Sequence, residues 1–230
     1  MITETDIKHG FGYRSHDLND LFEGNKLSTF MNKLEKQCII DTDRYKANDY
    51  LGHGFEFLIN ILLVSSPIDN RFGISNYEPI LVNDTGVDGI GFNIYDKKSV
   101  IQCKYRANSE TFLTANEDKL SNMFSCAQTT HFISTVNSEV ENLKSLKERN
   151  LINDKNFKKE LKELEEQENI KRHYVFTTAK GLNFYTDNEM YKNEVKCVGY
   201  DDLRYLLDNN KSFWKLCRQI SLEIINKTNK

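Results

Sequence analysis

The sequence has few of the features that mark disulfide-linked, zinc-finger or fibrous proteins. It contains two prolines in 230 residues, and none of its five cysteines belongs to a CxxC pair. Such spacing argues against a zinc site and a disulfide framework, and it favours buried free thiols in a reducing compartment. These cysteines are Cys38, Cys103, Cys126, Cys197 and Cys217.

Long hydrophobic runs are absent as well. The longest apolar stretch, from Phe57 to Val64, is interrupted by Asn60 and is far too short to cross a bilayer. The first ten residues, MITETDIKHG, lack the basic segment and following apolar segment of a signal peptide. We therefore expect an intracellular, cytoplasmic protein with no membrane partner.

Positive charge is not in excess. Lys and Arg total 31 against 34 Asp and Glu, which gives a net charge of −3. A protein that coats nucleic acid along its whole surface is usually basic, so any contact with nucleic acid would need a local basic patch. The hydrophobic fraction of 39% is that of a globular protein, and 230 residues suffice for one sizeable mixed domain.

The spacing of apolar residues predicts an alternation of helices and strands. Residues 1–50 are polar and contain two stripes of apolar residues at helical spacing, which predicts an N-terminal helical extension. Residues 139–170 are rich in Lys and Glu, which predicts an inserted pair of solvated helices broken near 150–154. The stripes of the extension are Leu18, Leu21 and Phe22, then Leu27, Phe30, Met31 and Leu34.

The remaining pattern predicts a main domain over 51–221 and a C-terminal tail over 222–230. Its expected elements are a helix over 54–64, a strand near 77–82, a hairpin of strands 88–95 and 99–106, a helix over 114–127, strands at 131–136, 174–178 and 195–200, and a final helix capped by Asp201. This order favours an α/β fold with a mixed central sheet covered on both faces.

The segment VIQCKYR predicts a strand with polar and charged side chains on one face. Alternate residues of a strand share a face, so Gln102, Lys104 and Arg106 fall on one side and Ile101, Cys103 and Tyr105 on the other. An amide, an ammonium and a guanidinium thus stand in a row. An edge strand with one solvated face would show the same pattern.

Two carboxylates precede this strand. Asp88 lies among glycines in TGVDGIGF, where the backbone can bend or admit a ligand closely, although a simple turn would also use an aspartate. Glu56 is the only charge in an apolar helix, and a buried carboxylate is costly unless it is paired or bound to a metal. The alternative is that Glu56 lies on the flank of the helix and reaches water.

Taken together, these motifs resemble those of a known nuclease superfamily. The order of GHGFEF, TGVDG and VIQCKYR is similar to that of the PD-(D/E)xK nucleases, in the Mrr-like restriction endonuclease branch, whose QxK variant has glutamine in place of the second acidic residue. The resemblance covers residues 50–136 and extends more weakly to 173–181 and 195–207. It implies a restriction-endonuclease-like mixed β-sheet flanked by helices.

The resemblance also implies a site and a cofactor. Glu56, Asp88, Gln102 and Lys104 would be catalytic, and a Mg²⁺ ion, for which Mn²⁺ substitutes, would be bound by Glu56, Asp88, Gln102 and the backbone carbonyl of Cys103. Mg²⁺ prefers such oxygen ligands. Arg106 and Lys98 would contact DNA phosphates.

The implied activity is metal-dependent DNA cleavage in restriction, phage DNA processing or repair, inside a bacterial or phage-infected cell. The alternative is a non-catalytic DNA-binding or assembly subunit that retains the nuclease fold. Because one active site cuts one strand, double-strand cleavage would require a homodimer or two successive nicks. No GxxxxGK[ST] phosphate loop occurs, so a helicase or translocase would be a separate partner.

Overall fold

The computed structural model describes residues 18–39, 44–65, 72, 74–79, 88–92, 98–115, 142–168, 172–184 and 195–228. At the centre of this described part lies a five-stranded mixed sheet in the order β1-β2-β3-β5-β7. Its strands are β1 (Ser75–Pro79), β2 (Gly89–Phe92), β3 (Lys98–Lys104), β5 (Arg172–Thr177) and β7 (Val195–Val198).

The sheet changes direction at β3. β1, β2 and β3 pair antiparallel, whereas β3, β5 and β7 run parallel. Antiparallel neighbours can be joined by a tight turn, but parallel strands need a long crossover, and the chain between β3 and β5 supplies one. The antiparallel pairing of two strands expected within 88–106 is confirmed, while most of the connection expected between them lies outside the described residues. The fold is a mixed α/β fold with a five-stranded sheet flanked by helices.

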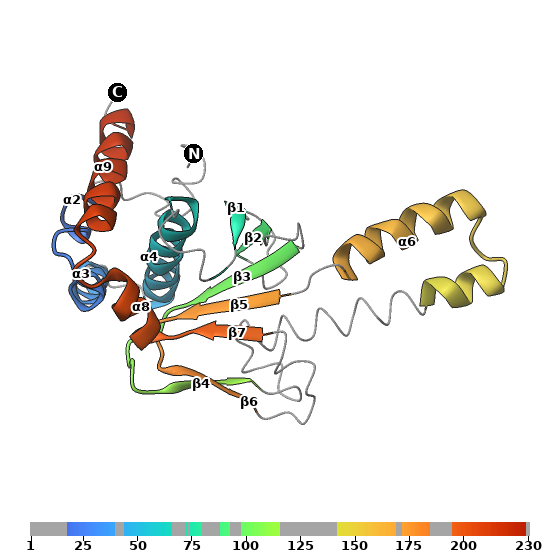
Figure 1. Ribbon diagram of the computed structural model, residues 1–230, viewed down its shortest axis with the longest axis horizontal. Helices are drawn as coiled ribbons and strands as arrows, with labels where there is room; N and C mark the ends of the chain where they lie inside the picture. The colour runs from blue at the N-terminus through green and yellow to red at the C-terminus, as the bar shows by residue number, and fades with distance from the viewer. Residues whose placement is uncertain are drawn as a thin grey trace.

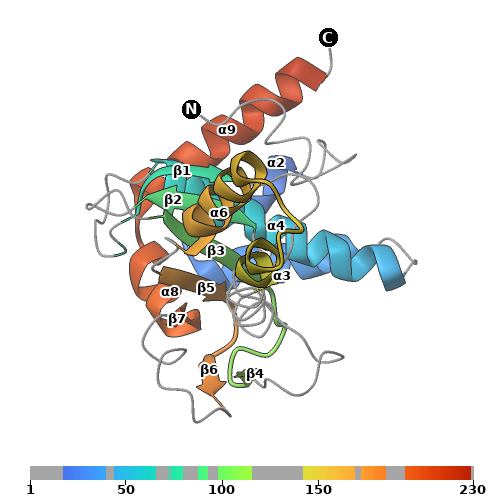
Figure 2. The ribbon, with the colours of Figure 1, turned by 90° about the vertical axis from the view of Figure 1, so that its right-hand side faces the viewer.

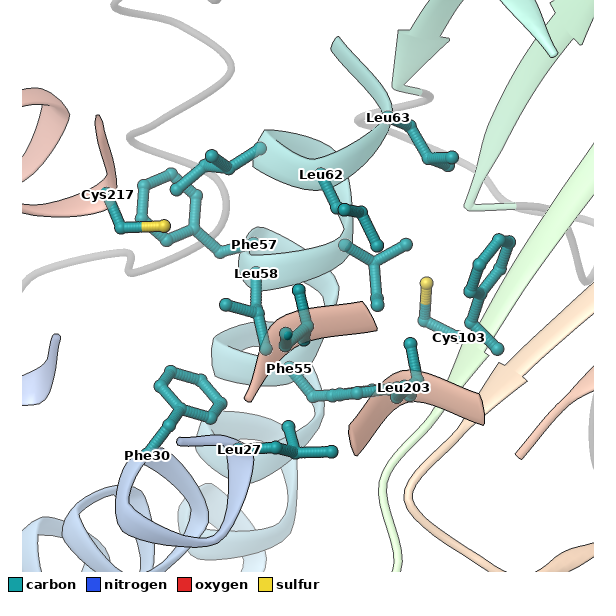
Figure 3. Packing of buried hydrophobic residues seen from close by; sticks show 14 of the residues in the cluster. Leu27, Phe30, Phe55, Phe57, Leu58, Leu62, Leu63, Cys103, Leu203 and Cys217 are labelled. Atoms are coloured by element: carbon teal, nitrogen blue, oxygen red, sulfur yellow. The ribbon is translucent and has the colours of Figure 1, made fainter. Parts of the chain in front are cut away.

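Helices cover one face of the sheet and form the main core. They are α2 (Leu18–Leu21), α3 (Leu27–Ile39), α4 (Arg44–Ser65), α8 (Tyr200–Leu207) and α9 (Lys211–Thr228), as Figure 1 shows. In Figure 3, Phe55 lies between α4 and the sheet near Leu203 of α8, and Phe57 points toward Cys217 of α9. The apolar residues of α4 thus link the sheet to the C-terminal helices.

The opposite face of the sheet carries a second, smaller sheet. β4 (Phe112–Ala115) and β6 (Gly181–Phe184) pair parallel. Leu113 of β4 is buried in a small apolar cluster with Val175, Ala179 and Val195. Described elements therefore cover both faces of the central sheet at β5 and β7.

A helical arm, residues 142–168, projects from the sheet where β5 begins (Figures 1 and 2). It consists of a short helix over 142–148 and α6 (Asp154–Glu168), joined by a turn at 149–153. Lys147 contacts Asp154 and lies 6.0 Å from the centre of the Phe157 ring, which fastens the two helices together. The broken pair of helices expected for 139–170 is confirmed over these residues.

The helical stripes at the N-terminus are confirmed and belong to the main core. The residues of both stripes are buried, and they contribute to the same apolar cluster as α4 and α9. Phe22 stacks on Phe30 with ring centres 5.5 Å apart, and both rings lie against Trp214 of α9. In the described residues 18–39, the expected extension is therefore integral to the core.

Helix α4 begins earlier than the sequence pattern indicated. It starts at Arg44, so Gly52 and Gly54 lie inside it and do not precede it. A Cβ at Gly54 would collide with the side chain of Leu34, so this glycine lets α3 approach α4 closely. Packing between helices overrides the low helix propensity of glycine here.

Two further expectations need correction. Phe112–Ala115 form β4, so the helix expected from residue 114 does not begin there, and the rest of 114–127 and the strand expected at 131–136 lie outside the described residues. The single closing helix is two helices, because Asn209 adopts a left-handed conformation (φ 65°) between α8 and α9.

The ends of these two helices also differ from the expectation. Asp202, not Asp201, accepts a hydrogen bond from the Gly199 N–H at the start of α8 (3.1 Å). Helix α9 continues to Thr228, so most of the expected tail over 222–230 is helical. None of the described helices has the length and apolarity needed to cross a membrane.

We predict opposite effects of alanine at two glycines. A Cβ at Gly199 would collide with the backbone carbonyl oxygen of Lys180, whereas a Cβ at Gly52 of α4 meets no atom within 4 Å. Gly199→Ala should lower the free energy of unfolding by about 1–3 kcal/mol, and Gly52→Ala should raise it by about 0.5–1 kcal/mol. Urea denaturation of both variants checks this. Equal effects would contradict the close approach at Gly199.

Candidate active site

A cleft of about 600 Å³ opens at the carboxyl end of β3, beside α4. It brings together Glu56, Asp88, Gln102, Cys103, Lys104 and Arg106, all of which were selected from the sequence. The other lining residues are Leu51, Gly52, His53, Tyr105 and Ala107. Lys98 is not among them: it is the first of the seven residues of β3, and Lys104 is the last. The two lysines are therefore about 20 Å apart along the strand.

Unequal strand lengths create the opening. The described pairing of β2 with β3 ends at Gly89 opposite Ile101, whereas β3 remains paired with β5 as far as Lys104 opposite Thr177. Asp88 lies directly before β2, and its backbone N–H still donates to the Ile101 carbonyl (2.8 Å). Its carboxylate oxygen Oδ2 accepts the next N–H directed to that side, from Cys103 (2.5 Å).

This bond holds the Asp88 carboxylate against the strand segment that carries the other polar residues. Only 6% of Asp88 is exposed. Because the N–H and C=O of one strand residue point to the same neighbour, the Cys103 carbonyl is directed to the Asp88 side as well. A carboxylate and a backbone carbonyl are thus both available at the cleft.

Gln102 contributes a buried amide oxygen with no partner. The residue is 4% exposed, and its Oε1 has no hydrogen-bond partner in the structure. A buried acceptor left unsatisfied costs on the order of 1–3 kcal/mol, and few are found in native proteins. Asn25 Oδ1 and Ser99 Oγ share this condition, but neither residue lines the cleft. The Gln102 oxygen therefore fits a site that a ligand completes.

Glu56 reaches the cleft from the flank of α4. Its neighbours Phe55 and Phe57 are fully buried, while the Glu56 side chain is 20% exposed. His53 lies one turn earlier, and its Nδ1 is 3.6 Å from Glu56 Oε2. Of the two expectations for Glu56, the structure supports the helix flank, and that flank faces the cleft.

The two carboxylates affect the ionisable groups buried beside the cleft. Burial, followed by the charges of Asp88 and Glu56, raises the pKa of the Cys103 thiol well above its usual value, and Lys104 opposes the shift. Burial is also the main cause of the raised pKa of Tyr77, with Cys103, Glu56 and Asp88 adding to it. The charges of Asp88 and Glu56 thus act on both buried groups beside the cleft.

Two buried threonines at the end of β5 fix the end of β3. Thr177 Oγ1 donates to the Lys104 carbonyl (2.7 Å). Thr178 Oγ1 accepts the Arg106 N–H (2.6 Å) and donates to the Arg106 carbonyl (2.8 Å). Lys104 and Arg106 are therefore placed by backbone bonds, while the exposed Arg106 side chain remains at the cleft rim.

Sequence reasoning missed these supporting residues. The Tyr105 hydroxyl donates to Glu35 of α3 (2.6 Å), and its ring meets Phe55 of α4 edge-on. The adjacent threonines of YVFTT were a visible signal for hydroxyl bonds at a strand end. The partnership of Glu35 and Tyr105 had no such signal, because the two residues are far apart in the chain.

The ligands available for a metal are mixed in type. In the described part of the chain, no three His, Cys, Asp or Glu side chains form a group able to hold a metal ion. A cation in this cleft would instead combine the carboxylates of Asp88 and Glu56 with the amide oxygen of Gln102 and the Cys103 carbonyl. The unpartnered, buried oxygen of Gln102 fits such a role.

Among the described residues, Cys38, Cys103, Cys197 and Cys217 form no disulfide, and all but Cys197 are buried, as the sequence predicts. Cys126 lies outside the described residues.

Comparison of the chain with protein-family models, with curated proteins and with solved structures returns no match. The geometry of the cleft is therefore the basis of the functional proposal.

We predict that Gln102→Leu does not lower the stability of the metal-free protein. Replacing an unpartnered buried amide by an apolar side chain removes an unsatisfied acceptor, so the free energy of unfolding should stay level or rise by about 1 kcal/mol. Gln37→Leu is the matched control, because Gln37 Oε1 accepts a hydrogen bond from Tyr50 (3.0 Å), and its loss should be destabilising. Urea denaturation in EDTA measures both. A marked loss of stability in Gln102→Leu would show that the amide has a structural role.

Proposed function

We propose that this protein is a metal-dependent DNA endonuclease with a restriction-endonuclease-like fold. It hydrolyses phosphodiester bonds in restriction, phage DNA processing or repair. The observation that carries the proposal is the buried, unpartnered Gln102 oxygen, which lines one cleft together with Asp88, Glu56 and Lys104. The family resemblance also supports the proposal, because the chain has a glutamate on a helix, then an aspartate at the start of a strand, then a QxK motif on the paired strand.

The ligand set suits a small hard cation. Mg²⁺ takes oxygen ligands and is often bound by one or two carboxylates together with water and substrate phosphate, and Mn²⁺ would substitute. Asp88, Glu56, Gln102 and the Cys103 carbonyl would hold it. A bound metal supplies Lewis acidity to the phosphate and lowers the pKa of bound water.

Hydrogen bonds within the protein hold the proposed catalytic groups in position. The Cys103 N–H holds the Asp88 carboxylate in place, and the threonine bonds to Lys104 and Arg106 fix the strand end. Lys104, half-buried in the cleft, would stabilise negative charge on the phosphate or orient the attacking water. Arg106 at the rim would contact a neighbouring phosphate.

We predict that Asp88→Ala and Lys104→Met each reduce DNA cleavage at least about 100-fold, because preorganised charge at the reacting phosphate is lost. The matched control is Asp201→Ala, which removes an exposed carboxylate paired with Arg204 outside the cleft. Nicking and linearisation of plasmid in Mg²⁺ is the measurement.

Unchanged cleavage in Asp88→Ala would reject this site. A wild-type protein that binds DNA but never cleaves it with Mg²⁺ or Mn²⁺ would instead support the alternative, a non-catalytic DNA-binding or assembly subunit. Analytical ultracentrifugation, alone and with DNA, tests the expectation of a homodimer.

We also predict that Gln102→Glu tightens metal binding in the absence of DNA. The neutral glutamine keeps the negative charge of the site low, so the wild-type protein should bind Mn²⁺ weakly until DNA contributes phosphate oxygens. Calorimetric titration with Mn²⁺ should show at least about tenfold tighter binding for Gln102→Glu than for the wild type. Equal affinities would argue that Gln102 is not a ligand, and Gln37→Glu controls for added charge elsewhere.

A further inference from the structure

A large aromatic side chain is exposed on β4, the strand that follows β3 in the chain. Phe112 is the first residue of β4 and is 46% exposed. It lies opposite Gly181 of β6, and Lys180 Nζ is 5.7 Å from the centre of its ring. Single exposed apolar residues are common, so exposure alone would not make this a binding site.

One hydrogen bond and a short chain segment connect Phe112 and Lys180 to Thr178 at the end of β5. The Lys180 N–H donates to the carbonyl of Thr111, directly before Phe112 (2.8 Å). Lys180 is two residues beyond Thr178, which holds Arg106 by two hydrogen bonds, and two residues span at most about 7 Å. Figure 1 shows that β4 and β6 begin at the end of the molecule where β5 ends.

The charges around the ring suit a nucleic-acid strand. Lys180 is exposed beside Phe112, and the exposed Arg106, which lines the cleft, precedes Phe112 by six residues in the chain. Glu110 is the only carboxylate in the described loop over 105–111. Proteins that bind single-stranded DNA combine cations for the backbone with aromatic rings on which bases stack.

We propose that Phe112 and Lys180 bind an unpaired nucleotide of the DNA strand that enters the cleft, with the base on the ring and the phosphate at Lys180. The inference rests on the proposed DNA cleavage and narrows its substrate. Bases inside a duplex have both faces covered by their neighbours, so a base that stacks on Phe112 must come from a flap, an overhang or a frayed end. The preferred substrate is therefore DNA with a single-stranded segment next to the scissile bond.

The test is a comparison of single-stranded and blunt duplex oligonucleotides by fluorescence anisotropy in EDTA, where no cleavage occurs. Phe112→Ala should weaken binding of the single strand about tenfold and leave binding of the blunt duplex unchanged. Phe112→Trp should retain the affinity, and its added indole fluorescence should be quenched by the bound base. Tyr205→Ala is the matched control, because Tyr205 is an exposed aromatic that lines a different pocket.

Equal affinity of Phe112→Ala and wild type for the single strand would overturn the proposal, as would a wild type that binds no single strand. An equal loss for both oligonucleotides would also overturn it. The proposed cleavage activity can fail independently of the nucleotide site. If the wild-type protein leaves plasmid uncut in Mg²⁺ but Phe112→Ala still weakens binding of the single strand, the endonuclease proposal is rejected and the nucleotide site is retained. Cleavage with unaltered Phe112→Ala binding would reject the nucleotide site alone.

Discussion

The candidate site depends on one hydrogen bond, from the Cys103 N–H to the Asp88 carboxylate. The described ladder between β2 and β3 stops at Ile101, and a side chain then takes the position that a backbone carbonyl would hold in a longer strand. The bond has two consequences. It satisfies a buried N–H of the central strand, and it fixes a carboxylate where the sheet opens. If β2 paired with β3 for two more residues, the sheet would close over this opening.

The polar groups of the candidate site lie beside the apolar core, and one of them lowers stability. The cleft gathers two carboxylates, an amide oxygen without a partner and a lysine next to the apolar core that α4 forms with the sheet. The unpartnered oxygen of Gln102 costs free energy in the folded protein that a bound cation would recover. The surroundings offset this cost. Phe55 and Tyr105 pack closely, Glu35 binds the Tyr105 hydroxyl, and the threonines of β5 secure the end of β3.

Patterns within short segments were predictable from the sequence. The alternation of VIQCKYR placed Ile101, Cys103 and Tyr105 in the core, and the glycines around Asp88 marked the start of a strand. Features set by distant contacts were not predictable. Phe112–Ala115 are a strand because Gly181–Phe184 pair with them, and Gly54 lies inside α4, where the side chain of Leu34 packs against it. Lys98 shares a strand with Lys104, but it starts that strand and so lies away from the cleft.

The helical arm occupies the crossover between β3 and β5, a connection that must be long in any case. Doubling the length of such a loop adds only about 0.6 kcal/mol of closure entropy. The arm forms its own contacts through Lys147, Asp154 and Phe157, so its sequence can change with little effect on the register of the sheet. The sequence of this segment can therefore diverge, and a fusion partner can be inserted at its turn. In both cases the end of β3 that bears Gln102 and Lys104 keeps its position.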